Sequence, residues 1–341
     1  MSKDILVGIV GAGRIGCVHA QTMHTMVSGV RVGAVCSASG DSAKKLAEDF
    51  GIPKYGNDYR ELCTNPDLDA IAICSATETH LEIIVAAARA GKHIFCEKPL
   101  ALDIHAIDRA LKVVADSGVH FMLGFNHRHD AGVMGVRKAI EQGVIGKPEM
   151  VFLTGRDPSL QPLSYLETSG GIFLDTVVHD FDVSRYLLAD EPEEIYARGE
   201  CNVDTAIAGF GDYDTVMAIA RFRSGVLVHY NNSRRAVYGF DQRVEVLGPK
   251  GRLETSNIHE NNITFAAVDG YHRAPIKNFF MDRYMEAYQY EGKVFAECIR
   301  DNRTPPCGAR DGRQSVLMAL AATKSAKENR PVRISEVDPA R

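Results

Sequence analysis

A glycine-rich turn near the start of the chain restricts the fold more than any other feature of the sequence. The continuously apolar segment Ile5–Val10 is followed by Gly11, Gly13 and Gly16 in a G-x-G-x-x-G spacing, and residues 15–26 have helical periodicity. Gly11 allows a tight turn, Gly13 lets the backbone approach a phosphate, and Gly16 lets the helix pack close to the strand. The partial positive charge of a helix N-terminus favours phosphate groups. The turn therefore predicts a dinucleotide-binding β-α-β unit, although such turns also occur for packing reasons alone.

Apolar and helical segments alternate through the first third of the chain. The expected strands are Ile5–Val10, Val30–Cys36, Ala70–Ser75, His93–Cys96 and His120–Gly124, and the expected helices are Ile15–Met26, Ser42–Phe50, His80–Ala90 and Ile104–Ser117. Strands that are apolar on both faces and alternate with helices are typical of a parallel sheet covered on both sides. We therefore expect an α/β fold whose residues 1–124 form a doubly wound, parallel-sheet Rossmann domain.

The pattern changes after Gly124, and a chain of 341 residues is long enough for a second domain. Alternating polar and apolar residues, with turn residues between the segments, are typical of an antiparallel sheet with one covered and one open face. The expected strands are Met150–Thr154, Ile195–Cys201, Val216–Phe222, Val226–Asn231 and Arg243–Leu247, and the expected helices are Leu174–Leu188, Met285–Arg300 and Gly312–Glu328. Residues 125–341 are thus expected to form an α+β domain with a large, mostly antiparallel, open-faced sheet.

Charge and composition exclude several classes of protein. A net charge of −5 provides no basic field for nucleic acid. No apolar run reaches the roughly 18 residues that a membrane span needs, and the run at Ile5–Val10 is too short for the core of a signal peptide. The eight cysteines are scattered and form no C-x-x-C pair, which favours buried thiols over a disulfide framework or a zinc site. We expect a cytoplasmic protein with no membrane or nucleic-acid partner.

Ser37 stands where dinucleotide-binding turns of this type place an acidic residue, about 20 positions after the glycines. That acid normally binds the ribose 2′-hydroxyl of NAD and repels the 2′-phosphate of NADP. No arginine stands beside Ser37 to bind a 2′-phosphate, although Lys44 and Lys45 follow shortly after. The residues alone do not decide whether NAD or NADP is the cofactor. An alternative role for Ser37 is the N-cap of the next helix.

Lys98 follows a buried strand within the segment Phe95-Cys96-Glu97-Lys98-Pro99. The carboxyl ends of parallel strands open into the ligand crevice of such folds, so a lysine there would lie beside a bound dinucleotide. Partial burial prepares a lysine for proton transfer by lowering its pKa. The alternative, a solvated lysine after a strand, has equal weight on this segment alone.

Asp175 and His179 are four residues apart in an apolar helical pattern, hence on one face of the expected helix. Three interpretations compete: a metal site, for which no third ligand is evident, a buried structural pair, and a general base, His179, with Asp175 as its polar partner. A second polar segment, Asn126-His127-Arg128, follows the last strand of the first domain. Two interpretations are open for this segment: it binds a substrate near a domain junction, or it is a polar linker between the domains.

Together these segments resemble the glucose–fructose oxidoreductase and inositol dehydrogenase family (Gfo/Idh/MocA), over essentially the whole chain. The marks are Gly11-Ala12-Gly13-Arg14-Ile15-Gly16, Thr77-Glu78-Thr79-His80, Glu97-Lys98-Pro99, Gly124-Phe125-Asn126-x-Arg128, and Gly171 through Asp175-x-x-x-His179-x-x-Asp182. Within the family the chain is most similar to the myo-inositol 2-dehydrogenases, with Arg156-Asp157-Pro158 and Tyr238-Gly239-Phe240-Asp241 as further marks.

The resemblance implies NAD(P)-dependent oxidation of a secondary hydroxyl of a cyclic polyol, with myo-inositol, giving 2-keto-myo-inositol, as the best candidate. It implies that His179 takes the hydroxyl proton, that Asp175 orients the imidazole and contacts the substrate, that Lys98 stabilises the alkoxide, and that no metal is needed. It also implies a homo-oligomer, a tetramer or dimer formed through the open sheet face. Implied contacts to the dinucleotide are Gly11, Gly13, Arg14, Ile15, Gly16, Ser37, Thr77, His80, Glu97 and Lys98, and those to the substrate are Asn126, His127, Arg128, Asp157, Asp175, His179 and Tyr238.

Two departures concern specificity. His127 stands where inositol dehydrogenases tend to have arginine, and Ser37 replaces the ribose-binding acid. A dehydrogenase or reductase of another sugar or polyol is an alternative, since it would use the same residues. A non-catalytic NAD(P)-sensing regulator is another, but it has no use for Lys98, Asp175 and His179 together.

Overall fold

The computed structural model describes residues 4–340, and these form two compact units. Unit 1 comprises the described residues up to His129 together with Met285–Val316, and unit 2 comprises Asp130–Tyr284 and the described residues from Leu317 onward. The division into domains at residue 125 stays a proposal. Among the described residues, no helix is both long enough and apolar enough to cross a membrane.

Unit 1 contains a parallel six-stranded sheet in the order β3-β2-β1-β4-β5-β6, the strand order of a doubly wound dinucleotide-binding fold. Every pair of neighbouring strands in it is parallel. The order reverses between β1 and β4, and in such sheets ligands bind beyond the carboxyl ends of the strands at this point. The strands are β1 Ile5–Val10, β2 Val30–Cys36, β3 Tyr55–Gly56, β4 Ala70–Ile73, β5 His93–Glu97 and β6 Phe121–Gly124.

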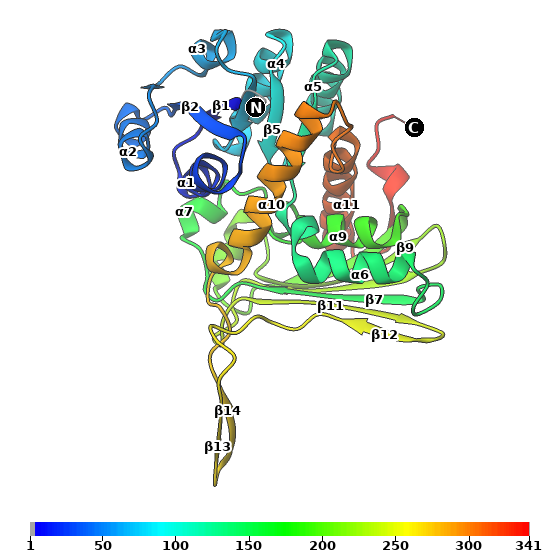
Figure 1. The fold of residues 1–341 in the computed structure, drawn as a ribbon. Helices are drawn as coiled ribbons and strands as arrows, with labels where there is room; N and C mark the ends of the chain where they lie inside the picture. Colours follow the sequence, from blue (N-terminus) through cyan, green and yellow to red (C-terminus); the bar gives the residue numbers. More distant parts are fainter. Residues whose placement is uncertain (1–3, 341) are drawn as a thin grey trace. The chain divides into compact units, whose positions relative to one another are not determined.

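The helices of unit 1 follow the strands in alternation (Figure 1). Helix α5, Ile104–Ser117, has the predicted bounds, because Asp103 accepts a hydrogen bond from the His105 amide at its start and Gly118 adopts a left-handed conformation at its end. The others are α1 Arg14–Gln21, which continues as a π-helical turn at Thr22–Met26, α2 Gly40–Phe50, α3 Tyr59–Thr64 and α4 His80–Arg89, with short 3₁₀ turns at Thr77–Thr79 and Asn126–His129.

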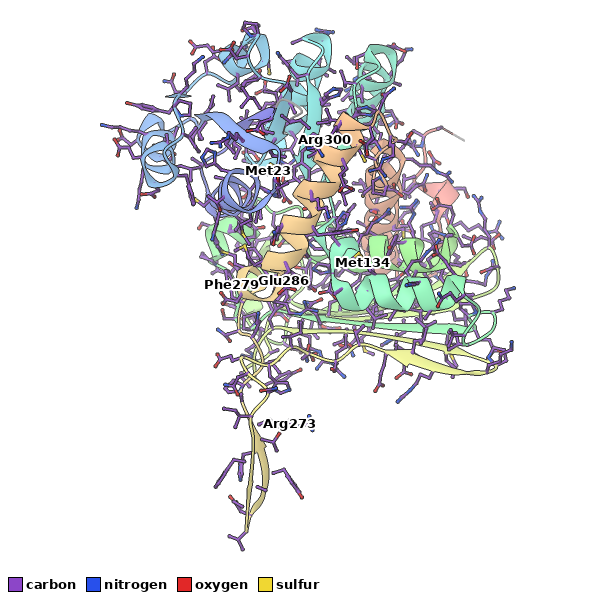
Figure 2. The ribbon with its side chains drawn as sticks, in the orientation of Figure 1. Met23, Met134, Arg273, Phe279, Glu286 and Arg300 are labelled. Carbon is purple, nitrogen blue, oxygen red and sulfur yellow. The ribbon has the colours of Figure 1, made fainter. Side chains whose placement is uncertain are left out.

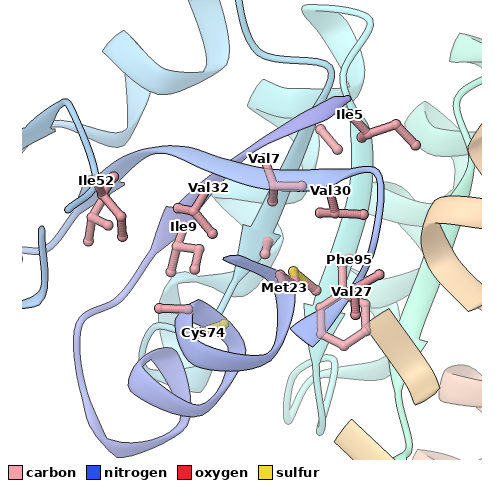
Figure 3. Close-up of a cluster of buried hydrophobic side chains, with 14 of the residues drawn as sticks. Ile5, Val7, Ile9, Met23, Val27, Val30, Val32, Ile52, Cys74 and Phe95 are labelled. Atoms are coloured by element: carbon pink, nitrogen blue, oxygen red, sulfur yellow. The ribbon is translucent and has the colours of Figure 1, made fainter. Parts of the chain in front are cut away.

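One hydrophobic cluster joins β1, β2 and the first helix of unit 1 (Figure 3). Ile9, Val35 and Phe95 are completely buried, and Met23 is 1% exposed. Phe295, from helix α10, Phe280–Arg300, packs into the same cluster and meets the ring of Phe95 edge to face. Residues far apart in the sequence therefore hold the strand that leads into the glycine turn.

Unit 2 contains a seven-stranded, mostly antiparallel sheet in the order β12-β11-β7-β10-β9-β8-β15. Only β7 and β10 pair in parallel among its described strands. Alternate residues are buried and exposed along β9, with Val216 buried and Met217 and Ile219 about half exposed. One face is thus covered and the other open, as predicted. The strands are β7 Met150–Arg156, β8 Pro192–Glu200, β9 Thr215–Phe222, β10 Leu227–Ser233, β11 Asp241–Gly248, β12 Gly251–Glu254 and β15 Val332–Arg333.

Helices α6, Ala131–Glu141, and α9, Val178–Leu188, lie together over the covered face of this sheet (Figure 1). The prediction of one helix over Leu174–Leu188 is wrong. The chain forms the single turn α8, Ile172–Asp175, and starts α9 after Thr176 and Val177. Asp175 and His179 are therefore on two successive helices and not on one continuous face. The remaining helices are α7 Leu163–Leu166 and α11 Ala309–Glu328.

A two-stranded hairpin of β13, Thr264–Ala267, and β14, Gly270–Arg273, extends away from the sheet of unit 2 (Figures 1 and 2, where Arg273 is labelled). It pairs with no other strand among the described residues. Three of its apolar side chains are largely exposed, namely Phe265 at 63%, Tyr271 at 83% and Val268 at its tip. The sequence analysis did not predict this element.

Candidate functional site

The glycine turn lies at the switch point of the parallel sheet. The Gly11 amide donates to the Cys36 carbonyl oxygen at 2.7 Å, and the Cys74 amide donates to the Val10 carbonyl oxygen at 2.7 Å, so the turn is fixed to both neighbouring strands. Gly11 has φ of +106°, and a Cβ there would lie 2.4 Å from the Cys74 carbonyl oxygen. A Cβ on Gly16 would lie 2.0 Å from the Gly11 carbonyl oxygen. Both positions therefore require glycine for the fold itself.

Gly13 differs, because a Cβ placed there would meet no atom within 4 Å. Its φ of −79° is open to any residue, so neither the turn nor the packing requires glycine. The glycine at this exposed N-cap leaves open space in which a bound group can approach the backbone closely. The residues present thus fit the pyrophosphate of a dinucleotide, with the amides at the start of α1 as donors.

Ser37 directly follows the second strand, β2, but it does not cap the next helix. Ser39 is the N-cap of α2, and the Ser37 hydroxyl accepts a hydrogen bond from the Ser42 hydroxyl at 3.0 Å. The N-cap alternative for Ser37 is therefore wrong. An uncharged side chain turned toward α2 leaves this strand end without a carboxylate.

Lys98 follows β5 directly, and its backbone is held from two sides. Its amide donates to Glu97 Oε2 at 3.2 Å, and Glu97 Oε1 lies 2.6 Å from His19 Nε2 on α1. Glu97 is 7% exposed and His19 is completely buried, between the rings of Phe95 and Tyr288. The carboxylate of Glu97 therefore serves the packing of unit 1, while its predicted contact with the dinucleotide stays a prediction.

His80 is also buried, at 1% exposed, and it supports the segment after Lys98. Its Nδ1 lies 2.9 Å from the Pro99 carbonyl oxygen and its Nε2 lies 3.1 Å from the Ser75 carbonyl oxygen. Burial lowers the pKa of His80, which favours the neutral ring. Thr77 lies in the 3₁₀ turn between Ser75 and His80, at the end of β4 next to the glycine turn. The structure thus brings the predicted cofactor residues of unit 1 to the ends of β1, β4 and β5.

The segment Asn126-His127-Arg128 is buried within unit 1. Arg128 donates to the Pro306 carbonyl oxygen at 3.0 Å and to Asp311 at 2.9 Å. These bonds give its guanidinium a role in joining the 3₁₀ turn to the start of α11. Contact of these three residues with a substrate stays a prediction.

Asp175 in unit 2 accepts hydrogen bonds on both carboxylate oxygens. Tyr165 Oη donates to Oδ1 at 2.7 Å, and Arg234 Nη1 donates to Oδ2 at 2.9 Å. Partial burial and the Asp175 carboxylate raise the pKa of Tyr165 well above its ordinary value, and the charge of Asp157 adds to this. The predicted residue Asp175 therefore binds the Tyr165 hydroxyl, and the charge of Asp157 acts on the same phenol. Asp175 can accept protons and hydrogen bonds there while its orientation is fixed.

His179 occupies the first turn of α9, next to Asp180. Asp180 is buried, accepts a hydrogen bond from Asn232 Nδ2 at 2.6 Å, and has its pKa raised by burial to about 7. In the described part of the chain, no group of three or more His, Cys, Asp or Glu side chains could hold a metal ion. The metal interpretation of Asp175 and His179 therefore has no third ligand in the structure either.

Tyr238 joins a polar cluster at the end of β7. Its hydroxyl donates to Asp241 Oδ2 at 2.6 Å and accepts from Arg156 Nη1 at 2.9 Å, and its side chain is 51% exposed. The two motifs Arg156-Asp157-Pro158 and Tyr238–Asp241, which are far apart in the sequence, thus meet. An exposed phenol with its hydroxyl fixed in this way suits a contact to a polyol, which stays a prediction.

Sequence reasoning missed four of the residues that hold the predicted ones: His19, Tyr165, Asp212 and Arg234. Three of them act through partners distant in the chain, such as Glu97 for His19 at a separation of 78 residues, and Tyr165 lies 10 residues before Asp175. No local spacing indicates such pairs.

The chain matches two family descriptions in succession. Residues 5–125 match the oxidoreductase family with the NAD-binding Rossmann fold, and residues 133–254 match the GFO/IDH/MocA C-terminal domain. The myo-inositol 2-dehydrogenase of Thermotoga maritima is 40% identical over 97% of this chain and 99% of its own length. The inositol 2-dehydrogenase of Rhizobium meliloti is 44% identical over 96% and 98%.

A solved structure of similar fold is that of scyllo-inositol dehydrogenase from Lactobacillus casei with bound NAD(H) and scyllo-inositol. It superposes with a TM-score of 0.92 at 29% identity and covers 98% of this chain and 99% of that one. The glycine turn, the strand order and these matches lead to one conclusion: the chain belongs to the GFO/IDH/MocA family of NAD-binding oxidoreductases.

Proposed function

We propose that the protein oxidises a secondary hydroxyl of a cyclic polyol with NAD, and that myo-inositol, converted to 2-keto-myo-inositol, is its substrate. The observation that carries the proposal is the near full-length similarity to two inositol 2-dehydrogenases, in a chain that contains the predicted residues Lys98, Asp175 and His179. The exposed phenol of Tyr238 and the fixed carboxylate of Asp175 supply polar groups of the kind that a polyol requires.

In this proposal His179 accepts the proton of the hydroxyl that is oxidised. Asp175, held by Tyr165 and Arg234, accepts a hydrogen bond from the substrate and orients the imidazole. Lys98 stabilises the negative charge that develops on the substrate oxygen. NAD, when bound, supplies the hydride acceptor. A positioned base of this kind contributes about 10²–10⁴-fold to the rate.

We infer that NAD is the preferred cofactor, although Ser37 removes the carboxylate that would repel NADP. The end of β2 offers no arginine to a 2′-phosphate, and the described lysines nearby, Lys44 and Lys45, lie on α2. The L. casei relative was solved with NAD(H). Comparing the kcat/KM for NAD with that for NADP tests this choice.

We also propose a homo-oligomer, a tetramer or dimer, that buries the open sheet face of unit 2. Exposed apolar residues lie on this face, with Met150 beside Leu227 and Ile219 beside Tyr196 across neighbouring strands. Exposed apolar strips of this kind mark interfaces between proteins. Sedimentation should show a smaller species for Ile219→Asp, while Val144→Asp, which changes an exposed apolar residue outside the sheet, should leave the assembly unchanged.

The compartment is proposed to be the reducing cytoplasm. No disulfide joins any of the eight cysteines, all of which lie within residues 4–340, and six of them are at most 4% exposed.

The decisive experiment pairs NAD and NADP with myo-inositol, scyllo-inositol, glucose and galactose and follows the absorbance of the reduced nicotinamide. We expect reduction with NAD and myo-inositol, and its loss in Lys98→Ala and His179→Ala. No reduced cofactor with any polyol or sugar would refute the proposal. Tight NAD binding without turnover would instead indicate a regulatory protein.

A further inference from the structure

Arg234 has the largest completely buried side chain of the described residues, at 1% exposed. It lies directly after β10, where its amide donates to the Asp214 carbonyl oxygen at 2.8 Å. Burying a guanidinium is unfavourable unless carboxylates or hydrogen bonds compensate its charge. Groups that compensate the charge of the Arg234 guanidinium must therefore lie next to it.

The partners of Arg234 are two carboxylates from different parts of unit 2. Nη1 donates to Asp175 Oδ2 at 2.9 Å, and Nη2 lies 3.5 Å from Asp212 Oδ2. Both carboxylates are nearly buried, with side chains 11% and 9% exposed. The Arg234 guanidinium thus lies between the carboxylates of Asp175 and Asp212 in a buried region of low dielectric constant.

Asp212 is itself fixed to the segment that carries Asp175. Its Oδ1 accepts the Ile172 amide at 2.8 Å, at the start of α8. Gly171 precedes this amide with φ of +87°, and a Cβ there would lie 2.9 Å from Asp212 Oδ1. The glycine therefore gives Asp212 room to bind the turn on which Asp175 stands.

We propose that Arg234 is a positioning residue, which together with Asp212 keeps Asp175 ionised and in a fixed orientation for catalysis. The catalytic part of this inference rests on the proposed function. Without the guanidinium, Asp175 and Asp212 become two neighbouring buried carboxylates, and such pairs retain a proton. A protonated Asp175 no longer accepts two hydrogen bonds in its present geometry.

Two further titratable groups act at this place: Tyr165, which binds Asp175, and Asp157, whose charge acts on Tyr165. Tyr165 donates a hydrogen bond to Asp175 and remains protonated, because its pKa is raised above its ordinary value. The charge of Asp157 adds to the rise in the pKa of Tyr165. Arg234 pairs directly with Asp175 and thus supplies positive charge that balances these carboxylates.

The test compares Arg234→Gln, Arg234→Lys and the double variant Arg234→Gln/Asp212→Asn as full-length proteins. For Arg234→Gln we expect kcat with myo-inositol to fall roughly 10²-fold at neutral pH and to recover as the pH rises. The double variant removes the competing carboxylate, so the added pH dependence should disappear. Arg234→Lys keeps the charge but loses the fork of donors, so it should show the wild-type pH profile at reduced kcat.

Arg185→Gln is the matched control, because it removes another buried arginine of unit 2 that pairs with a carboxylate, Glu191, at 2.8 Å. It should lower stability without adding pH dependence to kcat. A loss of activity in Arg234→Gln that is equally deep at every pH and unchanged by Asp212→Asn would refute the inference and leave Arg234 a structural residue.

Unfolding in urea separates this inference from the proposed function. A retained proton means a raised carboxyl pKa in the folded state, so Arg234→Gln should lose stability as the pH rises, and the double variant should not. If wild type oxidises no polyol while this difference appears, the proposed function fails and the electrostatic coupling of Arg234, Asp212 and Asp175 stands. If the difference is absent, the coupling fails whatever the substrate is.

Discussion

Glu97 Oε1 lies 2.6 Å from Nε2 of the buried His19, and the other oxygen of the same carboxylate accepts the amide of Lys98. One side chain thus joins α1, which begins at the glycine turn, to the residue after β5. The two ends of the proposed cofactor site in unit 1 are connected through this carboxylate.

Replacing Glu97 tests whether that connection is structural. Glu97→Ala leaves the His19 ring and the Lys98 amide without this acceptor, so we expect the free energy of unfolding to fall by about 1–3 kcal/mol. Glu97→Gln keeps an acceptor oxygen and should lose less. Urea unfolding and NADH titration measure the two effects, and a loss of NADH affinity in Glu97→Ala at full stability would show a cofactor contact instead.

Gly13→Ala should weaken cofactor binding without affecting folding. The new methyl group would meet open space in the protein but would occupy the path of a bound pyrophosphate, so we expect the Kd for NADH to rise about tenfold or more. The fluorescence of NADH reports binding, and the chain has no tryptophan that would add its own emission.

Two other glycines serve as controls for Gly13→Ala. Gly40→Ala also adds a methyl group in open space and should change neither binding nor stability, whereas Gly11→Ala should destabilise the fold by its contact with Cys74. Unchanged NADH affinity in Gly13→Ala would contradict the assignment of the turn.

Tyr165→Phe removes the hydroxyl that donates to Asp175 and should reduce kcat about tenfold, the value of one hydrogen bond to a charged group. The remaining bond from Arg234 keeps the carboxylate ionised, so the pH profile should be unchanged. Tyr196→Phe removes a similar exposed hydrogen bond, to Asn329, and should leave kcat unchanged. Equal activities of the two variants would count against a role for Tyr165.

Asp180→Asn should change the pH dependence of stability. Burial raises the pKa of Asp180 in the folded state to about 7 from an ordinary value of 3.8, so the wild-type contribution is favourable at low pH and is lost as the pH rises toward 7 and beyond. The asparagine does not ionise and should be relatively more stable at pH 8 than at pH 5. Identical pH slopes in urea unfolding of the two proteins would disprove the shift.

Regular elements with a clear period could be predicted closely. The bounds of β1, β2 and α5 match the prediction, because apolar runs and capping residues mark them directly in the sequence. The single helix over Leu174–Leu188 was wrong because the apolar pattern continues through Thr176 and Val177, where the backbone keeps helical dihedral angles but the regular i→i−4 hydrogen bonds are interrupted. The hairpin β13–β14 was not predicted because a strand without a buried face has no regular alternation.

The residues of the candidate site also differ in how far the sequence predicts them. Lys98, Asp175 and His179 stand out through their place in motifs, and their proposed roles remain to be tested. Arg234 and Asp212 could not be found in this way, because they meet Asp175 only through the fold, at separations of 59 and 37 residues along the chain. Local spacing in the sequence predicts candidate catalytic residues more readily than the residues that position them.

The hairpin β13–β14 has a consequence for measuring assembly. A ribbon of two strands without a third strand or a packed face opens readily in water, so its amide hydrogens should exchange with solvent deuterium within seconds in an isolated chain. If another subunit covers Phe265 and Tyr271, exchange of those amides should slow by orders of magnitude and depend on protein concentration. Amide exchange in the hairpin β13–β14 would then measure the association of subunits directly.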